Sequence, residues 1–534
     1  MDATQLIIGP TITSLLGGIA LILLLYWYST RNHHYWKKRN VPFVPPLPLF
    51  GTVLDLMLKP LHETELNRYR KYGQIYGHYE GTNPVLSIAD PVLIKKILVK
   101  DFLSFPNRRT FQLGDSIMEN NLVSLQGEDW KRVRSIMSPT FTTGKLKKIF
   151  SIIMDSTETC LNNYKKYAKS GEPVDLKKIY SAFTMDLIAS SAFSTKLDSY
   201  SDPNNKFVTA ARHILQGLNC RLLFFLVLFQ RLCLLFGFSA LSPKGMNFFK
   251  TLVLEIVEER KNTAKVRNDF LQLMMNAVKE NEEKQASDEL ESEDLTEIYE
   301  NVNEDREVLK TVEKKTLSNN ELIAQCIIFL LAGHETTSSA LSFATYLLTI
   351  NPDTQEKLFL EVKETLSSTC GEITYEAIQN MKYLDCVISE TLRLFSPAVR
   401  FERVAAEDYD LGVMGIKIPK GMLVTIPAYA VHKDPKYFPD PEKFDPDRFS
   451  PEERAKRDPN VYMPFGMGPR NCVGMRFALL VTKISLAIVI KNFRIVRCSE
   501  TKVPIEFAPG TQGMSPKEVK VKIEIREDNI RATE

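Results

Sequence analysis

One cysteine of this chain stands in a setting that suits metal chemistry. The run FGMGPRNCVGMRFA, residues 465–478, places Cys472 among three glycines, a proline and two arginines, directly before a long apolar helical pattern. No second cysteine forms a CxxC pair with it. A single thiolate indicates a preassembled cofactor such as haem rather than bare zinc, because haem needs only one protein ligand on one face. The alternative is a buried cysteine on a glycine-rich turn.

The neighbours of Cys472 suit a thiolate bound to haem. The glycines permit a tight turn and let the backbone approach a flat ring. A helix expected to begin near Val473 offers its positive end to the sulfur and, with nearby backbone N–H groups, keeps it deprotonated. Arg470 can reach a carboxylate of the ring, and Phe465 can pack beside the sulfur and exclude water.

This segment matches the pattern FxxGxRxCxG at every fixed position. On that string the chain resembles the cytochrome P450 superfamily. The resemblance implies heme b, iron protoporphyrin IX, as the cofactor and Cys472 as the axial ligand of its iron. A thiolate ligand pushes electron density toward the iron and favours cleavage of the O–O bond.

A second family motif lies in LLAGHETTSS, residues 330–339, within an apolar helical pattern that begins near Leu322. It resembles the AGx[DE]T motif of the central helix on the opposite side of the haem. The resemblance implies that Glu335 and Thr336 relay protons to bound dioxygen and that Ala332 lies over the ring. The alternative for Thr336 is a hydroxyl that only hydrogen-bonds its own helix backbone.

Further motifs supply partners for the haem propionates. WKRVR places Trp130 and Arg134 on the same side of one helix, and the resemblance implies that both meet the propionates. Matches to the 3A-like subfamily add Arg108 in NRR and Arg403 in RFERV.

The likeness extends over essentially the whole chain and is closest to the microsomal 3A-like monooxygenases. Runs such as SETLRLFSPAVRFERV and YAVHKDPKYFPDPEKFDPDRF carry it. Within them, Glu390, Arg393 and Arg448 are expected to form a buried structural network. The predicted fold is mainly α, the cytochrome P450 fold, with a large helical body and small β-sheets. Periodicity agrees, since helical patterns dominate to about residue 395 and short strands follow.

The N-terminal segment has the composition of a membrane anchor. Residues 6–28 carry no charge and are long enough to cross a bilayer. Basic residues follow at once, which favours a cytosolic body: Arg31, Lys37, Lys38 and Arg39. We expect residues 1–30 to be a single-pass anchor in the endoplasmic reticulum membrane, residues 31–50 a basic and proline-rich linker, and residues 51–534 the haem-thiolate catalytic domain. A cleaved signal peptide is the alternative.

Two stretches interrupt the helical pattern. Residues 221–242 are intensely apolar but broken by Gln230 and Arg231, which favours a buried helix pair or a loop that dips into the membrane surface over a second span. Residues 279–307 are rich in acids and poor in large apolar groups, so we expect a mobile surface loop.

The composition excludes other classes of protein. The chain has 534 residues, a hydrophobic content of 44% and a net charge of +3, so nothing global indicates binding to nucleic acid. Its eight cysteines show no regular spacing, which argues against a disulfide framework or a zinc site.

The resemblance implies a monooxygenase that oxidises lipophilic small molecules such as xenobiotics, steroids or fatty acids. The chain has no dinucleotide fingerprint, so NADPH–cytochrome P450 reductase is the expected electron donor, with cytochrome b5 as a second candidate. The expected docking bases are Lys131, Arg132, Lys145, Lys147, Lys148 and Lys483. The expected substrate pocket includes residues 109–123 and 222–241 together with Ile328, Leu331, Ala332, Ala398, Arg400, Gly513 and Met514.

Two other functions stay open at this point. Phrases such as LSFATYLLTINPDTQEKL resemble thromboxane synthase, which rearranges a peroxide without a reductase. That relative lacks the acid–threonine pair, whereas this chain has Glu335 and Thr336. A haem sensor or carrier without enzymatic activity is the other alternative.

Overall fold

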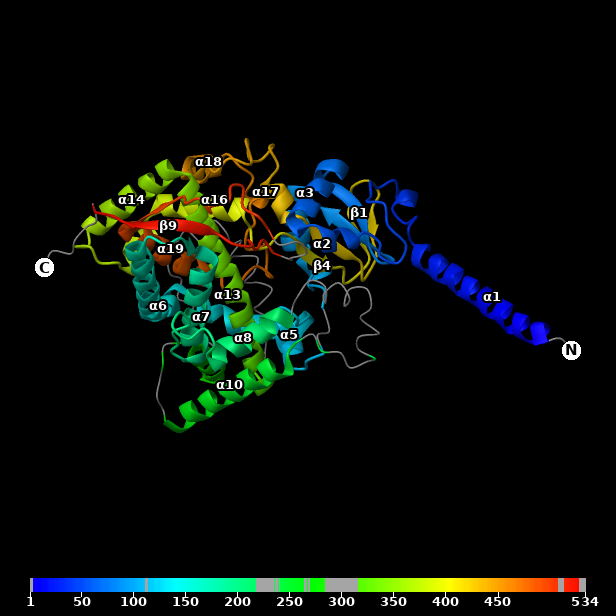
Figure 1. The fold of residues 1–534 in the computed structure, drawn as a ribbon, viewed down its shortest axis with the longest axis horizontal. Helices are drawn as coiled ribbons and strands as arrows, with labels where there is room; N and C mark the ends of the chain where they lie inside the picture. The colour runs from blue at the N-terminus through cyan, green and yellow to red at the C-terminus, as the bar shows by residue number, and fades with distance from the viewer. Residues whose placement is uncertain are drawn as a thin grey trace.

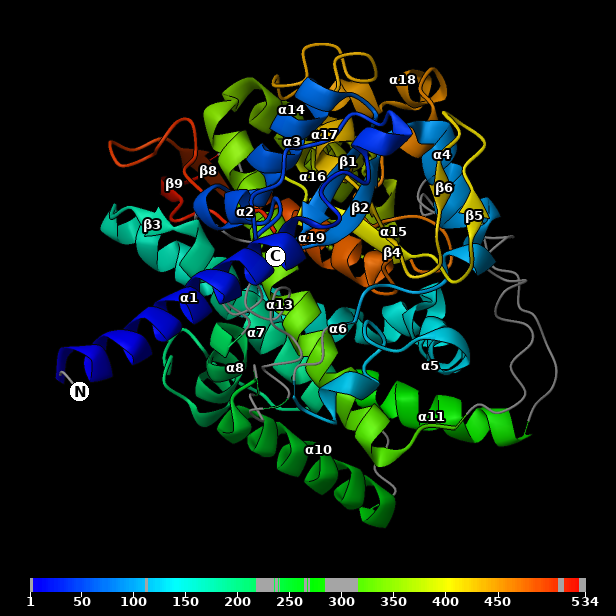
Figure 2. The same cartoon turned by 90° about the vertical axis from the view of Figure 1, so that its right-hand side faces the viewer.

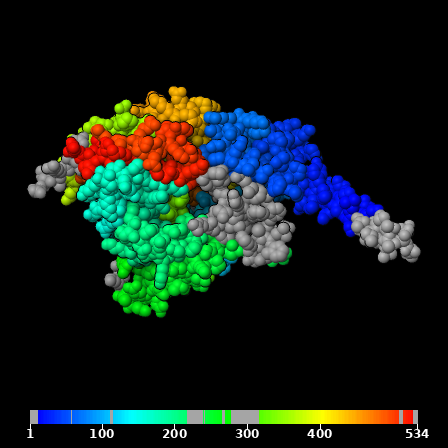
Figure 3. Space-filling view, viewed as in Figure 1, coloured from blue at the N-terminus to red at the C-terminus, as the bar shows by residue number. Residues whose placement is uncertain are grey.

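The computed structural model describes residues 3–110, 114–217, 235, 239, 241–263, 267, 269–283, 316–507 and 513–527. Within them the chain is mostly helical and carries three small sheets, so the predicted fold class is confirmed. Helix α1 (Ala3–Thr30) stands out from the body at the end where β1 lies (Figures 1 and 3). Its segment Ile12–Thr30 is apolar and long enough to cross a membrane, and only 6% of it is buried by the rest of the chain.

The remaining elements form the body. Its helices are α2 (Leu54–Leu58), α3 (Leu61–Tyr72), α4 (Pro91–Lys95), α5 (Gly127–Met137), α6 (Thr143–Ser170), α7 (Leu176–Phe193), α8 (Lys206–Gly217), α10 (Pro243–Thr263), α11 (Phe270–Glu283), α13 (Asn319–Ile350), α14 (Pro352–Ser367), α15 (Tyr375–Asn380), α16 (Lys382–Leu394), α17 (Ala428–His432), α18 (Pro451–Ala455) and α19 (Met475–Asn492). Its strands are β1 (Ile75–Glu80), β2 (Asn83–Ile88), β3 (Val174–Asp175), β4 (Phe401–Val404), β5 (Tyr409–Asp410), β6 (Lys417–Ile418), β7 (Leu423–Ile426), β8 (Phe493–Val496) and β9 (Lys520–Ile525).

Helix α13 runs through the middle of the helical body (Figure 1). It begins with a capping box in which Ser318 and Glu321 each bond the backbone of the other, and Pro352 follows its end. Apolar residues occur on every face of this helix, which is typical of a helix that is buried on all sides. Helices α7 and α19 pack along it.

The largest sheet has the strand order β1-β2-β7-β4, with β1 and β2 joined as an antiparallel hairpin (Figure 2). The predicted linker lies against this sheet. Trp36 is fully buried over Gly77 of β1, where any Cβ would collide with the indole ring, and its Nε1 donates to the carbonyl oxygen of His78 at 3.2 Å. Val44 continues the contact through a backbone bond to Gly77. These contacts fix the start of the body relative to the end of α1.

A second sheet, in the order β3-β9-β8, ties the C-terminal strand to the start of α7. Val174 pairs with Val521, and the N–H of Leu176 donates to the carbonyl oxygen of Val519 at 2.8 Å. The segment that precedes β9 is therefore held beside the first turns of α7.

The predicted Glu390–Arg393–Arg448 network is confirmed. The carboxylate of Glu390 accepts from Arg393 Nε at 2.6 Å, and both side chains are fully buried. Arg448 Nε lies 3.5 Å from the same carboxylate. Arg393 also donates to the carbonyl oxygens of His432 and Pro441, so the network joins α16 to the loops that follow it.

Most of the two stretches that interrupt the helical sequence pattern lies outside the described residues. Residues 221–242, apart from 235, 239 and 241–242, and residues 284–307 lie outside the described part of the chain. Residues 279–283, the start of the predicted surface loop, lie instead at the end of helix α11, so the loop prediction is wrong there. For the rest of both stretches the predictions stay predictions.

The buried Glu390–Arg393 pair should be far more costly to break than an exposed pair of the same spacing. We expect Glu390→Gln to lower the free energy of unfolding by about 3–5 kcal/mol, because it leaves the charge of Arg393 buried without a partner. The matched control is Glu453→Gln, which breaks an exposed pair with Lys456 at the same i,i+3 spacing and should cost about 0–1 kcal/mol. Urea unfolding of both variants measures the difference, and equal losses would contradict this account.

Candidate functional site

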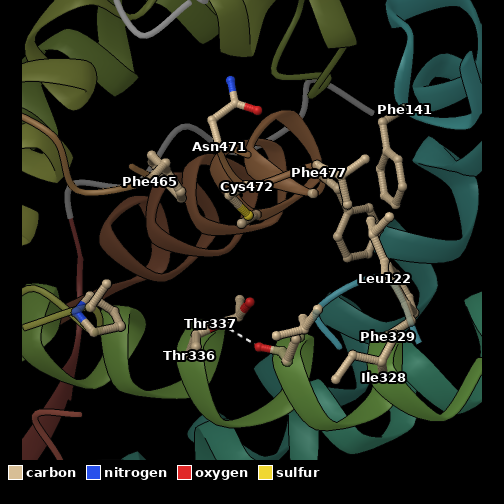
Figure 4. A pocket seen from close by; sticks show the side chains of 18 of the residues that line it. Leu122, Phe141, Ile328, Phe329, Thr336, Thr337, Phe465, Asn471, Cys472 and Phe477 are labelled. Carbon is tan, nitrogen blue, oxygen red and sulfur yellow. Dashed lines mark hydrogen bonds between the residues drawn. The ribbon is translucent and has the colours of Figure 1, made fainter. Parts of the chain in front are cut away.

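A cavity of about 320 Å³ lies between α13 and the segment that carries Cys472 (Figure 4). Its wall is mainly apolar: Leu122, Val123, Phe141, Ile328, Phe329, Ala332, Ala398, Phe401, Phe465 and Phe477. Three arginines also line it: Arg108, Arg134 and Arg470. The cavity has the size and the mixture of apolar walls and few polar groups that are typical of a small-molecule site.

Cys472 is exposed to this cavity, and Figure 4 shows its sulfur pointing across the open space toward Thr336. Burial raises the pKa of the thiol. The backbone N–H of Gly474 and the positive charges of Arg134 and Arg108 oppose that shift and favour the thiolate. Helix α19 begins at Met475, two residues later than the predicted start near Val473, and the N–H that bonds the sulfur belongs to its N-cap residue, Gly474.

The turn before Cys472 depends on backbone conformations that glycine adopts readily. Gly466 has φ +79° and Gly468 has φ +69°. At Gly468 a Cβ would also collide with the carbonyl oxygen of Leu98. The turn closes when the N–H of Cys472 donates to the carbonyl oxygen of Phe465 at 2.9 Å. Phe465 thus supports the cysteine through its backbone and lines the cavity with its side chain.

A buried histidine that sequence reasoning missed supports the start of this turn. The N–H of Met463 donates to Nε2 of His432 at 3.0 Å, and the carbonyl oxygen of His432 accepts from Arg393 at 2.9 Å. The Glu390–Arg393 pair is thereby connected to the cysteine segment. No residue type in YAVHKDP distinguishes this histidine from a surface residue, so the sequence carried no signal for it.

Opposite the sulfur, α13 presents Ala332, Gly333 and Thr336 to the cavity. Thr336 Oγ1 donates to the carbonyl oxygen of Ala332 at 2.6 Å, which is the backbone bond named above as its alternative role. Its hydroxyl remains exposed to the cavity (Figure 4). Glu335 does not line the cavity, and its carboxylate accepts instead from Ser515 Oγ at 3.2 Å.

The predicted propionate partners form a cluster of positive charge. Arg470 donates to the carbonyl oxygens of Pro106 and Leu125, and its guanidinium lies 4.2 Å above the Trp130 ring. Burial and the charges of neighbouring arginines lower the pKa of Arg470 to about 8. Burial and Arg108 likewise lower the pKa of Arg403 to about 9.

This arginine cluster fits an anionic group such as the two carboxylates of haem. Within the described part of the chain, Nη1 of Arg470 is buried without a hydrogen-bond partner. Glu402, whose charge acts on Arg108, is already bonded to Arg109 and Arg400. Positive charge that is buried without a counter-charge is costly. An anion bound beside these arginines would therefore stabilise the folded protein.

Two of the predicted partners play a partly different role from the one expected. Arg134 donates to the backbone and side-chain oxygens of Asn471, so it also holds the residue next to the cysteine. Arg403 does not line the cavity and lies behind its wall, beside Arg108. Trp130 is 2% exposed and packs against Phe102 and Arg470 at the cavity wall.

The predicted pocket wall is correct only in part. Ile328, Ala332 and Ala398 line the cavity, whereas Leu331 and Arg400 do not. Arg400 bonds the carboxylates of Glu65 and Glu402 at 3.0 and 2.7 Å, because a buried guanidinium is more stable among carboxylates than beside an apolar space.

The remaining pocket positions divide in the same way. Leu122 and Val123 of the predicted 109–123 segment line the cavity, whereas Gly513 and Met514 do not. Most of residues 222–241 lie outside the described residues.

The predicted docking bases also need one correction. Lys483 is buried on α19 and bonds Asp385 at 2.7 Å and Gln379 at 3.1 Å, so it cannot meet a partner. The sequence of α19 does not show whether Lys483 lies on the buried side or on the exposed side of the helix. The other five bases are at least partly exposed: Lys131, Arg132, Lys145, Lys147 and Lys148.

Comparison with known proteins gives a consistent result. A family model described as cytochrome P450 matches residues 41–523. The chain is 41% identical to cytochrome P450 3A5 of Homo sapiens over 97% of both chains. It is 40% identical to cytochrome P450 3A13 of Mus musculus, over 91% of this chain and 92% of that protein, and 39% identical to cytochrome P450 3A9 of Rattus norvegicus, over 95% and 96% respectively.

His432 should make stability depend on pH. Burial, Arg393 and Lys433 lower the pKa of this imidazole to about 3, whereas in the unfolded chain it is about 6.5. The unfolded state therefore binds the proton first, and the stability that His432 contributes above pH 6.5 is lost as the pH falls toward 3. We expect the advantage of the native chain over His432→Gln to shrink by up to about 1.4 kcal/mol per pH unit in this window. Urea unfolding between about pH 7.5 and 4.5 measures it, and parallel curves would contradict the prediction.

Proposed function

This chain belongs to the cytochrome P450 family and is a monooxygenase by that membership; from this premise we propose that it inserts one atom of dioxygen into lipophilic substrates at the membrane of the endoplasmic reticulum. We propose heme b as the form of its haem, and NADPH as the source of electrons, delivered by a flavoprotein reductase. The alternative of a reductase-independent peroxide isomerase makes a different prediction, which is tested below.

One observation carries this proposal. The sulfur of Cys472 and Thr336 of α13 face each other across an apolar cavity (Figure 4), and three arginines also line that cavity. A planar dianionic porphyrin with two carboxylates matches each part of this arrangement. Cys472 would hold the iron, and Arg470, Arg108 and Arg134 would pair with the carboxylates.

When bound, haem would supply the activation of dioxygen at its iron, and a thiolate ligand favours that chemistry. The residues of the chain do the remainder. The apolar wall excludes water from the reacting atoms. The hydroxyl of Thr336 is placed to hold a proton at the side of the cavity opposite the sulfur. Arg134 and the glycine turn keep Cys472 in position.

The chemistry of the wall supports a lipophilic substrate. Aromatic rings make up part of the wall: Phe329 stacks on Phe270 at 4.5 Å between ring centroids and lies tilted against Phe477 at 5.4 Å. Gln325 offers no free polar group, because its amide bonds the backbone of Leu122 and Asn120. We propose xenobiotics, steroids or fatty acids as the substrate class.

The rest of the chain supports a membrane-bound enzyme with a separate electron donor. Helix α1 is proposed as the single anchor, followed by a basic segment on the cytosolic side. The exposed bases near α6, which include Lys147 and Lys148, are proposed to steer an acidic reductase, with cytochrome b5 as a second partner.

The first test of this proposal is the ligand of the iron. The reduced carbon-monoxide complex of the full chain should show the Soret band of a thiolate-ligated haem. Cys472→Ser and Cys472→His should lose that band and the NADPH-dependent activity, because the replacements are poorer electron donors. Cys498→Ser, at a cysteine outside the cavity, is the control and should keep both. A Soret band that is unchanged in Cys472→Ser would contradict the proposal.

The second test separates the monooxygenase from the peroxide isomerase. Thr336→Ala should lower product formation by on the order of 10²-fold, as expected for loss of a proton-transfer group, while NADPH is still consumed and peroxide is released. Thr336→Ser retains the hydroxyl and should keep most of the activity. Turnover of a hydroperoxide without NADPH, unaffected by Thr336→Ala, would instead show the isomerase.

A further inference from the structure

A line of polar side chains crosses the contact between α7 and α13. Helix α7 contributes Lys177, Ser181 and Thr184, which are spaced four and three residues apart and therefore share one face. Helix α13 contributes His334 and Glu335, and the segment before β9 contributes Ser515. We call these six residues the polar seam. None of them lines the cavity.

Three members of the polar seam form a continuous chain of hydrogen bonds. The ammonium group of Lys177 donates to Ser515 Oγ at 2.9 Å. Ser515 Oγ in turn donates to Oε1 of Glu335 at 3.2 Å. Both bonds have donors and acceptors in the order that a proton needs to pass from the lysine to the carboxylate.

The surrounding structure holds this chain in register. A further bond of Lys177, to the carbonyl oxygen of Pro516 at 3.0 Å, fixes its ammonium group beside Ser515. The side chain of Asp175 accepts from the backbone N–H groups of both Lys177 and Val519. The pairing of β3 with β9 secures the two segments to each other. The hydrogen bond from Lys177 to Ser515 therefore joins α7 to the segment before β9, and the β3–β9 pairing holds these two segments together.

The two ends of this series of hydrogen bonds are both partly buried, but only Glu335 is next in sequence to a residue that lines the cavity. Lys177 is only partly buried and can exchange protons with water. Glu335 directly precedes Thr336, whose hydroxyl lies in the cavity. His334, the titratable neighbour of Glu335, is bonded by Thr184 at 2.9 Å and Ser181 at 3.3 Å, and burial lowers its pKa.

We propose that Lys177 and Ser515 load Glu335 with the protons that the reaction at Thr336 consumes. The Lys177 ammonium passes a proton to Ser515 Oγ while the hydroxyl proton of Ser515 passes to the carboxylate of Glu335. Lys177 then regains a proton from water, so the net change is one proton moved from solvent to Glu335. Glu335 has three rotatable bonds and delivers the proton by turning from Ser515 toward Thr336. Lys177 and Ser515 are positioning residues in this scheme, and it rests on the proposed monooxygenase function.

A first measurement follows the proton without turnover. Infrared spectra of the full-length resting protein, recorded at about pH 5 with Glu335→Gln as the reference, isolate the carboxyl band of Glu335. After a rapid change from H2O to D2O, we expect this band to exchange at least tenfold more slowly in Ser515→Ala and in Lys177→Arg. Arginine keeps the charge and the donors of lysine but does not give up a proton, so it separates proton transfer from support of the fold.

Two control variants retain both the hydroxyl group at position 515 and the lysine at position 177. Ser515→Thr retains a hydroxyl, and Lys178→Arg changes the exposed neighbour of Lys177; both should exchange at the native rate. If Lys177→Arg also exchanges at the native rate, the relay is refuted, whether or not Ser515→Ala folds stably. Thermal unfolding of each variant identifies any change that comes from stability.

A second measurement uses the working enzyme. In Ser515→Ala and Lys177→Arg we expect at least a tenfold fall in product formed per NADPH, a matching rise in peroxide, and an unchanged spectral Kd for substrate. If wild type turns over and these variants retain its product yield, the relay is wrong and the proposed function stands. If wild type forms no product with NADPH and reductase, the proposed function fails on its own, and the exchange rates still decide whether the proton path exists.

Discussion

The position of one sulfur atom depends on a series of buried polar contacts that begins more than eighty residues away. Glu390 fixes Arg393, Arg393 holds the carbonyl oxygen of His432, and the ring of His432 holds the N–H of Met463. The turn that follows then closes onto Cys472. Each contact is shielded from water, so each is stronger than an exposed equivalent and each is costly to leave unpaired. The thiol is placed by the packing of the body rather than by the local sequence alone.

The charge around that sulfur obeys a second constraint. The arginines at the cavity wall lie close to one another and to Arg403 behind it, and burial and mutual repulsion lower the pKa values of Arg470 and Arg403. Such a cluster is unfavourable in an empty site and favourable beside a dianionic ligand. Stability of the folded chain and binding of haem are therefore linked, because a ligand that binds only the folded state stabilises it.

How much of this could be predicted from the sequence differed from residue to residue. The apolar N-terminal helix and the ion network around Glu390 follow from hydropathy and motif, and both are present as predicted. Arg400 and Lys483 were placed wrongly, because residue type alone does not tell a charge that faces a cavity or a partner from one that is paired inside the body. His432 could not have been found, since its role depends on a contact with a residue 31 positions away.

The same reasoning explains why an acid and a hydroxyl that are adjacent in sequence have different surroundings. Successive residues of an α-helix point about 100° apart, and the cavity lies on the side of α13 that carries Thr336 and Thr337, so Glu335 points away from it. Thr336 takes the apolar side opposite Cys472, and Glu335 takes the side that meets Ser515 and α7. The cavity can then exclude water around the reacting atoms while the acid remains bonded to groups that reach solvent. A carboxylate in the cavity itself would need a counter-charge or a proton in an apolar space. Helix α13 thus separates the apolar cavity from the polar seam by one step along its backbone.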